Sequence, residues 1–229
     1  MRAHIIAKTR WIVAAGPFRG MRYVQEESWL WPVPNLIGSY ESELNSSLET
    51  IIASRPSSVI DVGCAEGYYA VGLARRLPNV PVFAYDIDVT ARRICTEMAR
   101  INGVSATVEV LGECLLEDFK NRCSPGTFVI LDCEGYEGYE VNLLRPDLIP
   151  ELAHCTILVE IHDFIDPDIK PTLIRRFSGR LTQIIASEPR ATEDWPLIHE
   201  LSRNDQNLSL AEFRPILPTP MEWMIVYPV

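Results

Sequence analysis

The chain has 229 residues, of which 47% are hydrophobic, and this length and composition are ordinary for one globular domain with a sizeable core. Lysine and arginine number 21 against 31 aspartate and glutamate residues, so the formal net charge of −10 disfavours a nucleic-acid partner held by its phosphates. No apolar run reaches the roughly 18 residues of a membrane span, which argues against a membrane partner. The six scattered cysteines suit reduced thiols in a cytoplasmic protein.

Residues 1–35 are rich in tryptophan, proline and arginine and show no sustained periodicity. They are expected to form an accessory cap with a short hairpin around residues 18–24, and residues 36–229 are expected to form the main domain. The first element of that domain is predicted between residues 41 and 54. Apolar residues recur there with the 3.6-residue period of a helix that packs on a sheet, at Leu44, Leu48, Ile51 and Ile52.

A short buried strand is predicted at residues 58–62, and a loop of small residues follows it directly. Glycine in such a loop lacks the Cβ that would hold a ligand away from the backbone, and the helix expected over residues 68–77 would direct its free N–H groups at that ligand. The pattern indicates a loop for a nucleotide-type cofactor, although a turn that uses glycine for steric reasons alone looks the same. The candidate residues are Asp61, Gly63, Cys64, Ala65 and Gly67.

The next strand, near residues 81–86, ends on acidic residues. Asp86 lies roughly 20 residues beyond the loop, where dinucleotide-type folds place a carboxylate that accepts hydrogen bonds from ribose hydroxyls. Asp88 is better explained as the N-cap of a helix that starts near Thr90. Asp86 is therefore the predicted ribose ligand, with Ile87 beside it in the same cofactor site.

The rest of the chain alternates strands with helices, which predicts a parallel sheet with right-handed crossovers. The further strands are expected near residues 106–110, 127–132, 155–161 and 180–187. Residues 188–220 are expected to form a long loop with one short helix, and the apolar segment 221–227, which has no room for a crossover helix before it, should insert antiparallel. The predicted fold class is α/β, a Rossmann-like, mostly parallel seven-stranded sheet with an antiparallel last strand and helices on both faces.

The cofactor loop itself distinguishes between nucleotides, because Cys64 stands where the pyrophosphate-binding fingerprint has its second glycine. Residues 61–67, Asp-Val-Gly-Cys-Ala-Glu-Gly, resemble the first motif of the class I S-adenosylmethionine-dependent methyltransferases, whose cofactor carries an amino-acid end instead of a diphosphate. The resemblance implies S-adenosylmethionine as the cofactor and places Glu113, after the third strand, near its adenine. A helix N-terminal acid favoured by the helix dipole is the alternative for Glu113.

Downstream motifs narrow the resemblance to the FkbM-type methyltransferases. Residues 128–137 resemble their fourth strand and Asp-x-Glu-Gly-x-Glu signature, residues 157–162 the Glu-x-His end of their fifth strand, and residues 38–41 their Gly-x-Tyr-Glu segment. The similarity runs in the expected order over about residues 36–165. It implies that Tyr40 and Asp132 belong to the cofactor site.

Methyl transfer to a hydroxyl requires an in-line approach and removal of the hydroxyl proton. His162 is the predicted base, because imidazole titrates near neutral pH and this residue closes a strand whose end should face the cofactor; a structural histidine is the alternative. Asp132 and Glu134 lie two residues apart and should point to the same side, so they join His162 as catalytic candidates. Burying both carboxylates in their ionised form costs free energy, so a ligand, a cation, water or N–H groups must lie beside them.

A divalent metal is a further alternative, since carboxylates and imidazole follow the fourth and fifth strands. If a metal is present, Asp132, Glu160 and His162 are expected to hold it. Nothing in the spacing demands one, so Mg²⁺ is not part of the favoured interpretation.

The favoured interpretation is an S-adenosylmethionine-dependent methyltransferase that O-methylates a hydroxyl of a small molecule or sugar. N-methylation of a small molecule stays open. A NAD-linked oxidoreductase is a rival, although the missing third glycine and the absence of a Tyr-x-x-x-Lys pair argue against it, and a non-catalytic cofactor-binding scaffold is another. The expected partner is a small-molecule acceptor, and the sequence leaves a homodimer open.

Overall fold

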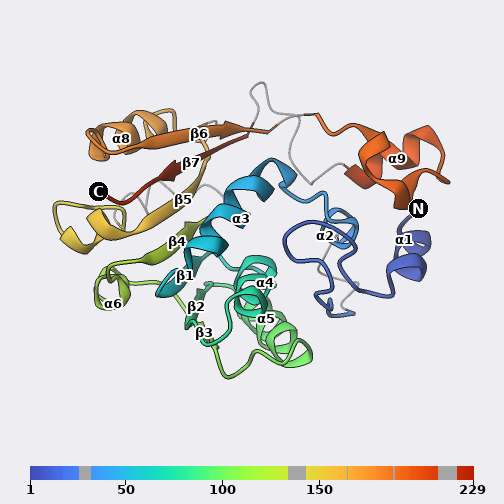
Figure 1. Cartoon of the computed structure of the whole chain (residues 1–229), viewed down its shortest axis with the longest axis horizontal. Coiled ribbons are helices and arrows are strands. Elements are labelled where there is room, and N and C mark those ends of the chain that lie inside the picture. Colours follow the sequence, from blue (N-terminus) through green and yellow to red (C-terminus); the bar gives the residue numbers. More distant parts are fainter. Residues whose placement is uncertain (26–31, 134–142, 164, 188, 211–220) are drawn as a thin grey trace.

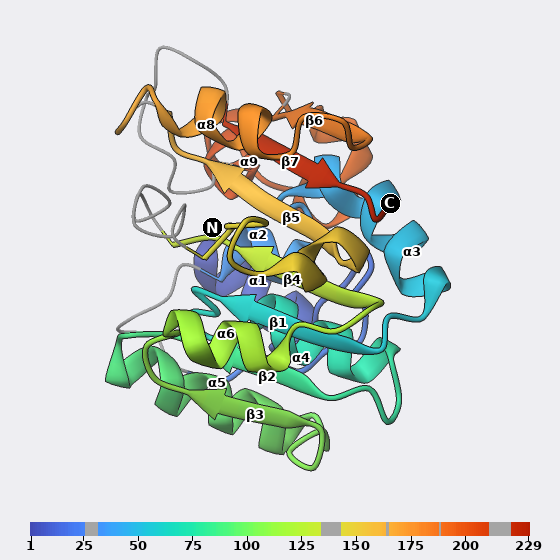
Figure 2. The ribbon, with the colours of Figure 1, turned by 90° about the vertical axis from the view of Figure 1, so that its left-hand side faces the viewer.

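The computed structural model describes residues 1–25, 32–133, 143–163, 165–187, 189–210 and 221–229. In this part of the chain seven strands form one sheet with helices on both faces (Figures 1 and 2). The strands are β1 (Ser58–Val62), β2 (Val82–Tyr85), β3 (Val108–Leu111), β4 (Thr127–Leu131), β5 (Thr156–Ile161), β6 (Thr182–Ala186) and β7 (Glu222–Val226). The helices are α1 (Arg2–Thr9), α2 (Val33–Ile37), α3 (Asn45–Ser54), α4 (Tyr68–Arg76), α5 (Val89–Ile101), α6 (Leu116–Arg122), α8 (Ile169–Arg176) and α9 (Arg203–Leu210).

The strand order is β3-β2-β1-β4-β5-β7-β6. Neighbours from β3 to β5 are parallel, and β7 runs antiparallel to both β5 and β6, which confirms the predicted fold class and its antiparallel last strand. Leu131 pairs with Val62 on one side and with Val159 on the other, so β1, β4 and β5 end side by side. The strand order reverses between β1 and β4, and open α/β sheets bind ligands at the carboxyl edge of such a reversal.

Apolar side chains fill the space on both faces of the sheet. Helices α3, α4 and α5 pack on one face, and α6 and α8 pack on the other through residues such as Phe119 and Leu173 (Figure 2). All residues of β1 and β4 are buried, as expected of strands that are covered on both sides. The two central strands therefore provide a rigid base for the residues that follow them.

The predicted helix at residues 41–54 is divided in the structure. A 3-10 turn, Ser42–Leu44, precedes α3, and Glu41 does not join either helix because its backbone is left-handed, with φ 46°. The predicted cap of α5 is confirmed: one carboxylate oxygen of Asp88 accepts hydrogen bonds from the N–H groups of Thr90 and Ala91, at 2.6 and 2.9 Å.

The N-terminal segment contains more regular structure than its sequence indicated. The hairpin lies earlier than residues 18–24: the Val13 N–H donates to the Met21 carbonyl at 2.9 Å and the Tyr23 N–H to the Trp11 carbonyl at 2.7 Å. Helix α1 was not predicted, because it buries only Ile5 and Thr9, and two positions in eight residues give no measurable period.

The described residues of segment 188–220 form two 3-10 turns, Thr192–Asp194 and Pro196–Ile198, and helix α9, in agreement with the single short helix expected there. No helix among the described residues combines the length and the apolar character that crossing a membrane requires. All six cysteines are free thiols.

Candidate functional site

On the sheet face that packs against α3–α5, apolar side chains give way to polar ones as the strands reach their carboxyl ends. Side chains alternate between faces along a strand, so every second residue belongs to the same row. Val59 is followed in its row by Asp61, Ile130 by Asp132, and Leu158 by Glu160 and then His162. The sheet therefore brings four titratable side chains to its carboxyl edge from β1, β4 and β5.

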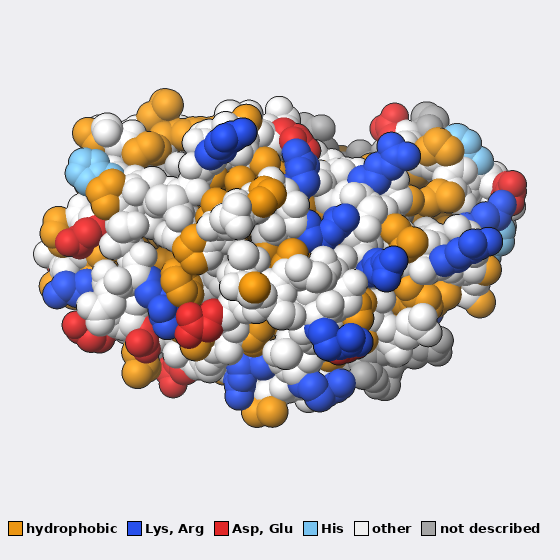
Figure 3. Space-filling model, turned by 60° about the horizontal axis from the view of Figure 1, so that its bottom comes forward, with side chains coloured by type: hydrophobic (Ala, Val, Ile, Leu, Met, Phe, Trp, Pro, Cys, Tyr) orange, Lys and Arg blue, Asp and Glu red, His pale blue; other side chains and the backbone are white. Residues whose placement is uncertain are grey.

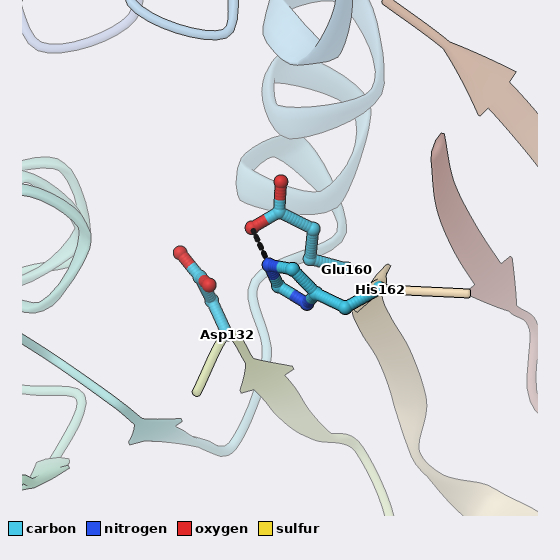
Figure 4. Close-up of side chains that lie close together, drawn as sticks. All are labelled: Asp132, Glu160 and His162. Carbon is cyan, nitrogen blue, oxygen red and sulfur yellow. Dashed lines mark ion pairs between the residues drawn. The ribbon is translucent and has the colours of Figure 1, made fainter. Parts of the chain in front are cut away.

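Asp132, Glu160 and His162 form a compact cluster, shown in Figure 4. The Nε2 atom of His162 lies 3.6 Å from a carboxylate oxygen of Glu160, and these side chains are only 3% and 7% exposed. One ligand atom from each of the three residues lies within 4.8 Å of the other two. The backbone N–H of Asp132 donates to the Val62 carbonyl at 3.0 Å, which continues the β1–β4 ladder and fixes the start of the side chain.

Asp61 lies beside this cluster and is 2% exposed. Burial, and then the negative charge of Asp132, raise the pKa of the Asp61 carboxyl from its usual 3.8 to about 8. The N–H of Ala70, in the first turn of α4, opposes this shift by donating to the carboxylate. The second oxygen, Oδ2, has no hydrogen-bond partner among the described residues. Asp61 is consequently largely protonated at neutral pH.

The two loop glycines are required by contacts within the protein. Gly63 has φ +85°, and a Cβ there would lie 1.7 Å from the backbone oxygen of Asp132. Gly67 has φ +93°, and its Cβ would lie 2.7 Å from the Cys95 sulfur. The expectation that these glycines clear space for a ligand is therefore incomplete, because the atoms nearest to the missing Cβ belong to Asp132, which follows β4, and to α5. Their contact with a cofactor stays a prediction.

Cys64 directs its thiol into the protein interior, where a hydrogen bond to Cys95 and burial raise its pKa well above the usual value. Ala65 occupies the left-handed region with φ 48°, and its N–H donates to the Asp86 carboxylate at 2.9 Å. At positions 64 and 65, a ligand would therefore meet backbone groups and the Ala65 methyl, because the Cys64 thiol points away from the loop surface.

Asp86 joins the loop to the end of β2. One of its carboxylate oxygens accepts from Ala65, and the other accepts from the Asp88 N–H at 2.8 Å. A carboxylate oxygen has two lone pairs, so ribose hydroxyls could still donate to both. Ile87 is 67% exposed, an apolar side chain at the sheet edge that a bound ring would cover.

Glu113 is exposed and lies between β3 and α6. Helix α6 begins at Leu116 and carries Glu117 and Asp118 in its first turn, so the structure does not place Glu113 at the helix N-terminus. Glu134 lies outside the described residues.

Aromatic residues surround the cluster on the α4 side, and sequence reasoning missed most of them. The predicted site residue Tyr40 packs edge-on against Tyr68, with ring centroids 5.2 Å apart. Tyr69 donates to buried Glu41, and its ring contacts that of Trp223, which pairs with Glu160 across β5 and β7. Tyr68 and Tyr69 begin α4 directly after the loop, and this pair is the feature of the sequence that could have indicated aromatic residues at the site.

Two further contacts concern the N-terminal segment. The Tyr23 hydroxyl donates to the Glu66 carboxylate at 2.5 Å and thereby ties this segment to the cofactor loop. A surface hollow of about 280 Å³ is lined by Lys8, Arg19 and Leu197 among others, and it contains none of the candidate site residues.

No family model matches the chain. The ribosomal protein L11 methyltransferase of Rhizobium rhizogenes (strain K84 / ATCC BAA-868) is 40% identical over 63 residues, which are 27% of this chain and 21% of that protein. The release factor glutamine methyltransferase of Flavobacterium psychrophilum (strain ATCC 49511 / DSM 21280 / CIP 103535 / JIP02/86) is 29% identical over 98 residues, 43% of this chain and 34% of that protein. The matches thus span about a fifth to a third of these relatives.

Solved structures extend the likeness over most of the chain. The human methyltransferase 10 domain containing protein superimposes with a TM-score of 0.55 at 12% identity, over 91% of this chain and 88% of that one. The O-methyltransferase TomG from Streptomyces achromogenes, solved in complex with SAM, gives a TM-score of 0.51 at 12% identity, over 90% and 92%. At such identities the likeness shows the fold, which is that of the class I methyltransferases.

Proposed function

We propose that this protein is an S-adenosylmethionine-dependent methyltransferase that O-methylates a hydroxyl of a small molecule or sugar. The observation that carries the proposal is the juxtaposition, at the carboxyl edge, of a small-residue loop, the Asp86 carboxylate, and the cluster of half-buried Asp132 with buried Glu160 and His162. The class I methyltransferase fold and the 40% identical segment support it. The resemblance of residues 38–41 and 157–162 to FkbM-type motifs favours that group.

The cofactor half of the site would be built by the loop and the end of β2. Backbone groups of residues 63–67 would hold the methionine end, and Asp86 would accept hydrogen bonds from the ribose hydroxyls. Ile87 would cover one face of the adenine, with Glu113 at its rim. This assignment gives the exposed Ile87 side chain a physical reason.

The acceptor half would be the cluster on β4 and β5. The acceptor oxygen attacks the sulfonium methyl in line, and its proton leaves at the cluster, where His162 is the predicted base and Glu160, 3.6 Å away, would stabilise the imidazolium. Because Glu160 and His162 are buried and Asp132 is half-buried, a slender hydroxyl-bearing group fits the cluster better than a folded surface.

A second candidate is N-methylation of a protein side chain. The curated relatives are named for ribosomal protein L11 and for release factor glutamine, and the chain shares 27–43% of its length with them. The same carboxylates would orient an amine or amide nitrogen. The two candidates share the cofactor and differ in the acceptor atom.

Titration calorimetry tests the cofactor first. We expect S-adenosylmethionine to bind with 1:1 stoichiometry and NAD to give no heat, while the reverse result would indicate an oxidoreductase. A screen with methyl-labelled donor against pools of hydroxylated compounds, amines and ribosomal proteins then identifies the acceptor. Donor binding without transfer to any pool would support a non-catalytic scaffold.

A further inference from the structure

The cluster at the ends of β4 and β5 has the geometry of a metal site, and we infer that Asp132, Glu160 and His162 bind one divalent transition-metal ion. Among the described residues, this is the group of three or more such side chains whose ligand atoms converge within 4.8 Å. Metal–oxygen and metal–nitrogen bonds of about 2.0–2.2 Å place two ligands of one ion at most about 4.4 Å apart. Adjacent ligands of a tetrahedral ion lie about 3.4 Å apart, so binding would draw the three side chains together by on the order of 1 Å.

The three ligands stand at the carboxyl ends of two paired strands of the sheet. Glu160 lies on β5 and His162 directly follows it, and both point to one face because they are two residues apart (Figure 4). Asp132 follows β4 and is fixed by its N–H bond to the Val62 carbonyl. Sites built on strands hold their ligands more precisely than sites built on loops.

The charge of the cluster also favours a cation. Two carboxylates lie beside one imidazole, and the whole residues Glu160 and His162 are only 5% and 2% exposed. Buried charges in proteins are paired or coordinate metals, because their desolvation is otherwise expensive. A divalent ion would neutralise the charge of two ionised carboxylates.

The ligand types indicate which ion. Mg²⁺ and Ca²⁺ prefer oxygen ligands, whereas a set of one imidazole and two carboxylates suits Mn²⁺, Fe²⁺, Co²⁺ or Zn²⁺. Three protein ligands leave coordination positions open, which is typical of catalytic sites and not of structural ones. An acceptor oxygen is the natural occupant of such a position.

This role deepens the proposed function and rests on it only in its catalytic part. Bound to the ion, the acceptor hydroxyl would lose its proton to solvent at a lower pH than the free hydroxyl. The oxygen lone pair then forms the new O–CH₃ bond while the C–S bond electrons return to sulfur, which yields the methyl ether and S-adenosylhomocysteine with no change in metal oxidation state. His162 would then be a ligand, and the proton would pass to water.

Metal binding is tested on the full chain without any methyl donor. After EDTA treatment and removal of the chelator, wild-type protein is titrated with MnCl₂ by calorimetry and by electron paramagnetic resonance, and Zn²⁺, Mg²⁺ and Ca²⁺ are added as competitors. We expect one Mn²⁺ per chain, displaced by Zn²⁺ and far less readily by Mg²⁺ or Ca²⁺. Asp132→Asn and Glu160→Gln keep the shape of each side chain and should weaken Mn²⁺ binding at least about 100-fold.

The matched control is Glu222→Gln. Glu222 lies on β7 next to β5, but it points to the other face and pairs with Lys170, so its loss should leave Mn²⁺ affinity within about twofold. Absence of Mn²⁺ and Zn²⁺ binding to folded wild-type protein overturns the inference, and so does an equal loss in the control. Calorimetry with S-adenosylmethionine separates the proposals: donor binding without metal binding removes the metal alone, and metal binding without donor binding removes the proposed function.

Discussion

Residues at the carboxyl edge of the sheet are held in states that their types alone do not reveal. Burial raises the pKa of Glu66, and the Tyr23 hydroxyl that donates to it partly opposes the shift. The pKa of the Asp61 carboxyl is raised to about 8, because burial desolvates it and Asp132 adds a negative charge beside it. The position of a carboxyl relative to its neighbours therefore decides whether it serves as a charge or as a neutral hydrogen-bonding group.

This state of Asp61 predicts an unusual dependence of stability on pH. A carboxyl with a folded pKa of about 8 and an unfolded pKa near 3.8 holds its proton longer in the folded chain. Its contribution to the free energy of unfolding is therefore fully present below about pH 4 and is lost as the pH rises through about 8. Asp61→Asn still accepts from the Ala70 N–H but does not ionise.

We expect Asp61→Asn to flatten the decline of stability between pH 4 and 8 and to raise the free energy of unfolding at pH 8 by on the order of 2 kcal/mol. Urea denaturation of both proteins at several pH values, in EDTA, measures this difference. Parallel pH profiles for wild type and variant would show that Asp61 is ionised in the folded protein.

Substitutions of Asp86 and Asp88 should affect cofactor binding and protein stability separately. Asp86→Ala should weaken S-adenosylmethionine binding by about 1–3 kcal/mol, because a carboxylate that would accept from ribose hydroxyls is lost from the site. Asp88→Ala removes the α5 cap and should cost about 1 kcal/mol of stability while donor affinity stays the same. Calorimetry and denaturation on the two variants check both parts, and an unchanged dissociation constant for a folded Asp86→Ala protein would remove Asp86 from the site.

At the scale of elements, the sequence predicts the sheet well because each strand has a local signature. Strand 127–131 is a nearly continuous apolar run, strand 58–62 is apolar apart from Ser58 and Asp61, and the observed bounds agree with the expected ones within a residue or two. No local segment of the sequence reveals which strand ends lie side by side, and this information came from the predicted fold class. The contact of Trp223 with Tyr69 could not be predicted, because 153 residues lie between these two positions in the chain.

The site was predictable to the same degree. Asp132, Glu160 and His162 could be selected because each follows or closes a strand, whereas the nearness of their ligand atoms depends on the register of β4 and β5. The true neighbour of Gly63 was also hidden from the sequence. It is the carbonyl of Asp132, which comes from the next strand in the sheet and not from the loop.

Gly63 consequently tests how closely β1 and β4 must approach. Gly63→Ala places a Cβ 1.7 Å from a backbone oxygen that cannot move without the sheet, in a residue with φ +85°, and should cost more than about 3 kcal/mol of stability. Gly112→Ala is the control, since no atom lies within 4 Å of its Cβ and its φ is not positive. Thermal and urea denaturation compare them. Near-equal stability of the two variants would mean that β4 readily shifts away from the loop.

At the scale of the whole molecule, charge is unevenly distributed despite the formal net charge of −10. Figure 3 shows lysine and arginine side chains spread over the face that carries α4, α5 and the N-terminal segment. Two arginines of α4 and α5 are already engaged: Arg76 forms two 2.8 Å hydrogen bonds to Glu49, and Arg92 donates to the carbonyls of Asp86 and Ile87. Guanidinium groups that already form hydrogen bonds within the protein contribute less free energy to the binding of phosphates.

We therefore expect only weak binding of RNA at physiological salt, with a dissociation constant above about 10⁻⁶ M, as for non-specific contacts. Filter binding of a labelled ribosomal RNA fragment at several salt concentrations measures it. Tighter binding that falls steeply with salt and is lost in Arg19→Glu would indicate that this face recognises nucleic acid and would favour a ribosomal acceptor.

The N-terminal segment belongs to the same apolar core as the sheet, and this predicts the effect of removing it. Ile5, Trp11, Phe18 and Met21 are buried in one cluster with residues of β1 and α4. The Phe18 ring occupies the space that Gly72 leaves open, where a Cβ would lie 2.5 Å from the ring, and it packs edge-on against Tyr68 at 5.1 Å. Deletion of residues 1–25 would expose this surface of α4.

We expect the chain without residues 1–25 to lose its cooperative thermal transition and its near-ultraviolet circular dichroism, and Phe18→Ala in the full chain to cost about 3–5 kcal/mol. Arg19→Ala, at the exposed neighbouring position, should change stability by less than about 0.5 kcal/mol. A truncated chain that melts cooperatively and binds S-adenosylmethionine like the full protein would show that the segment is an appendage. The tie between Tyr23 and Glu66 leads us to expect the opposite, because the segment then supports the cofactor loop as well as the core.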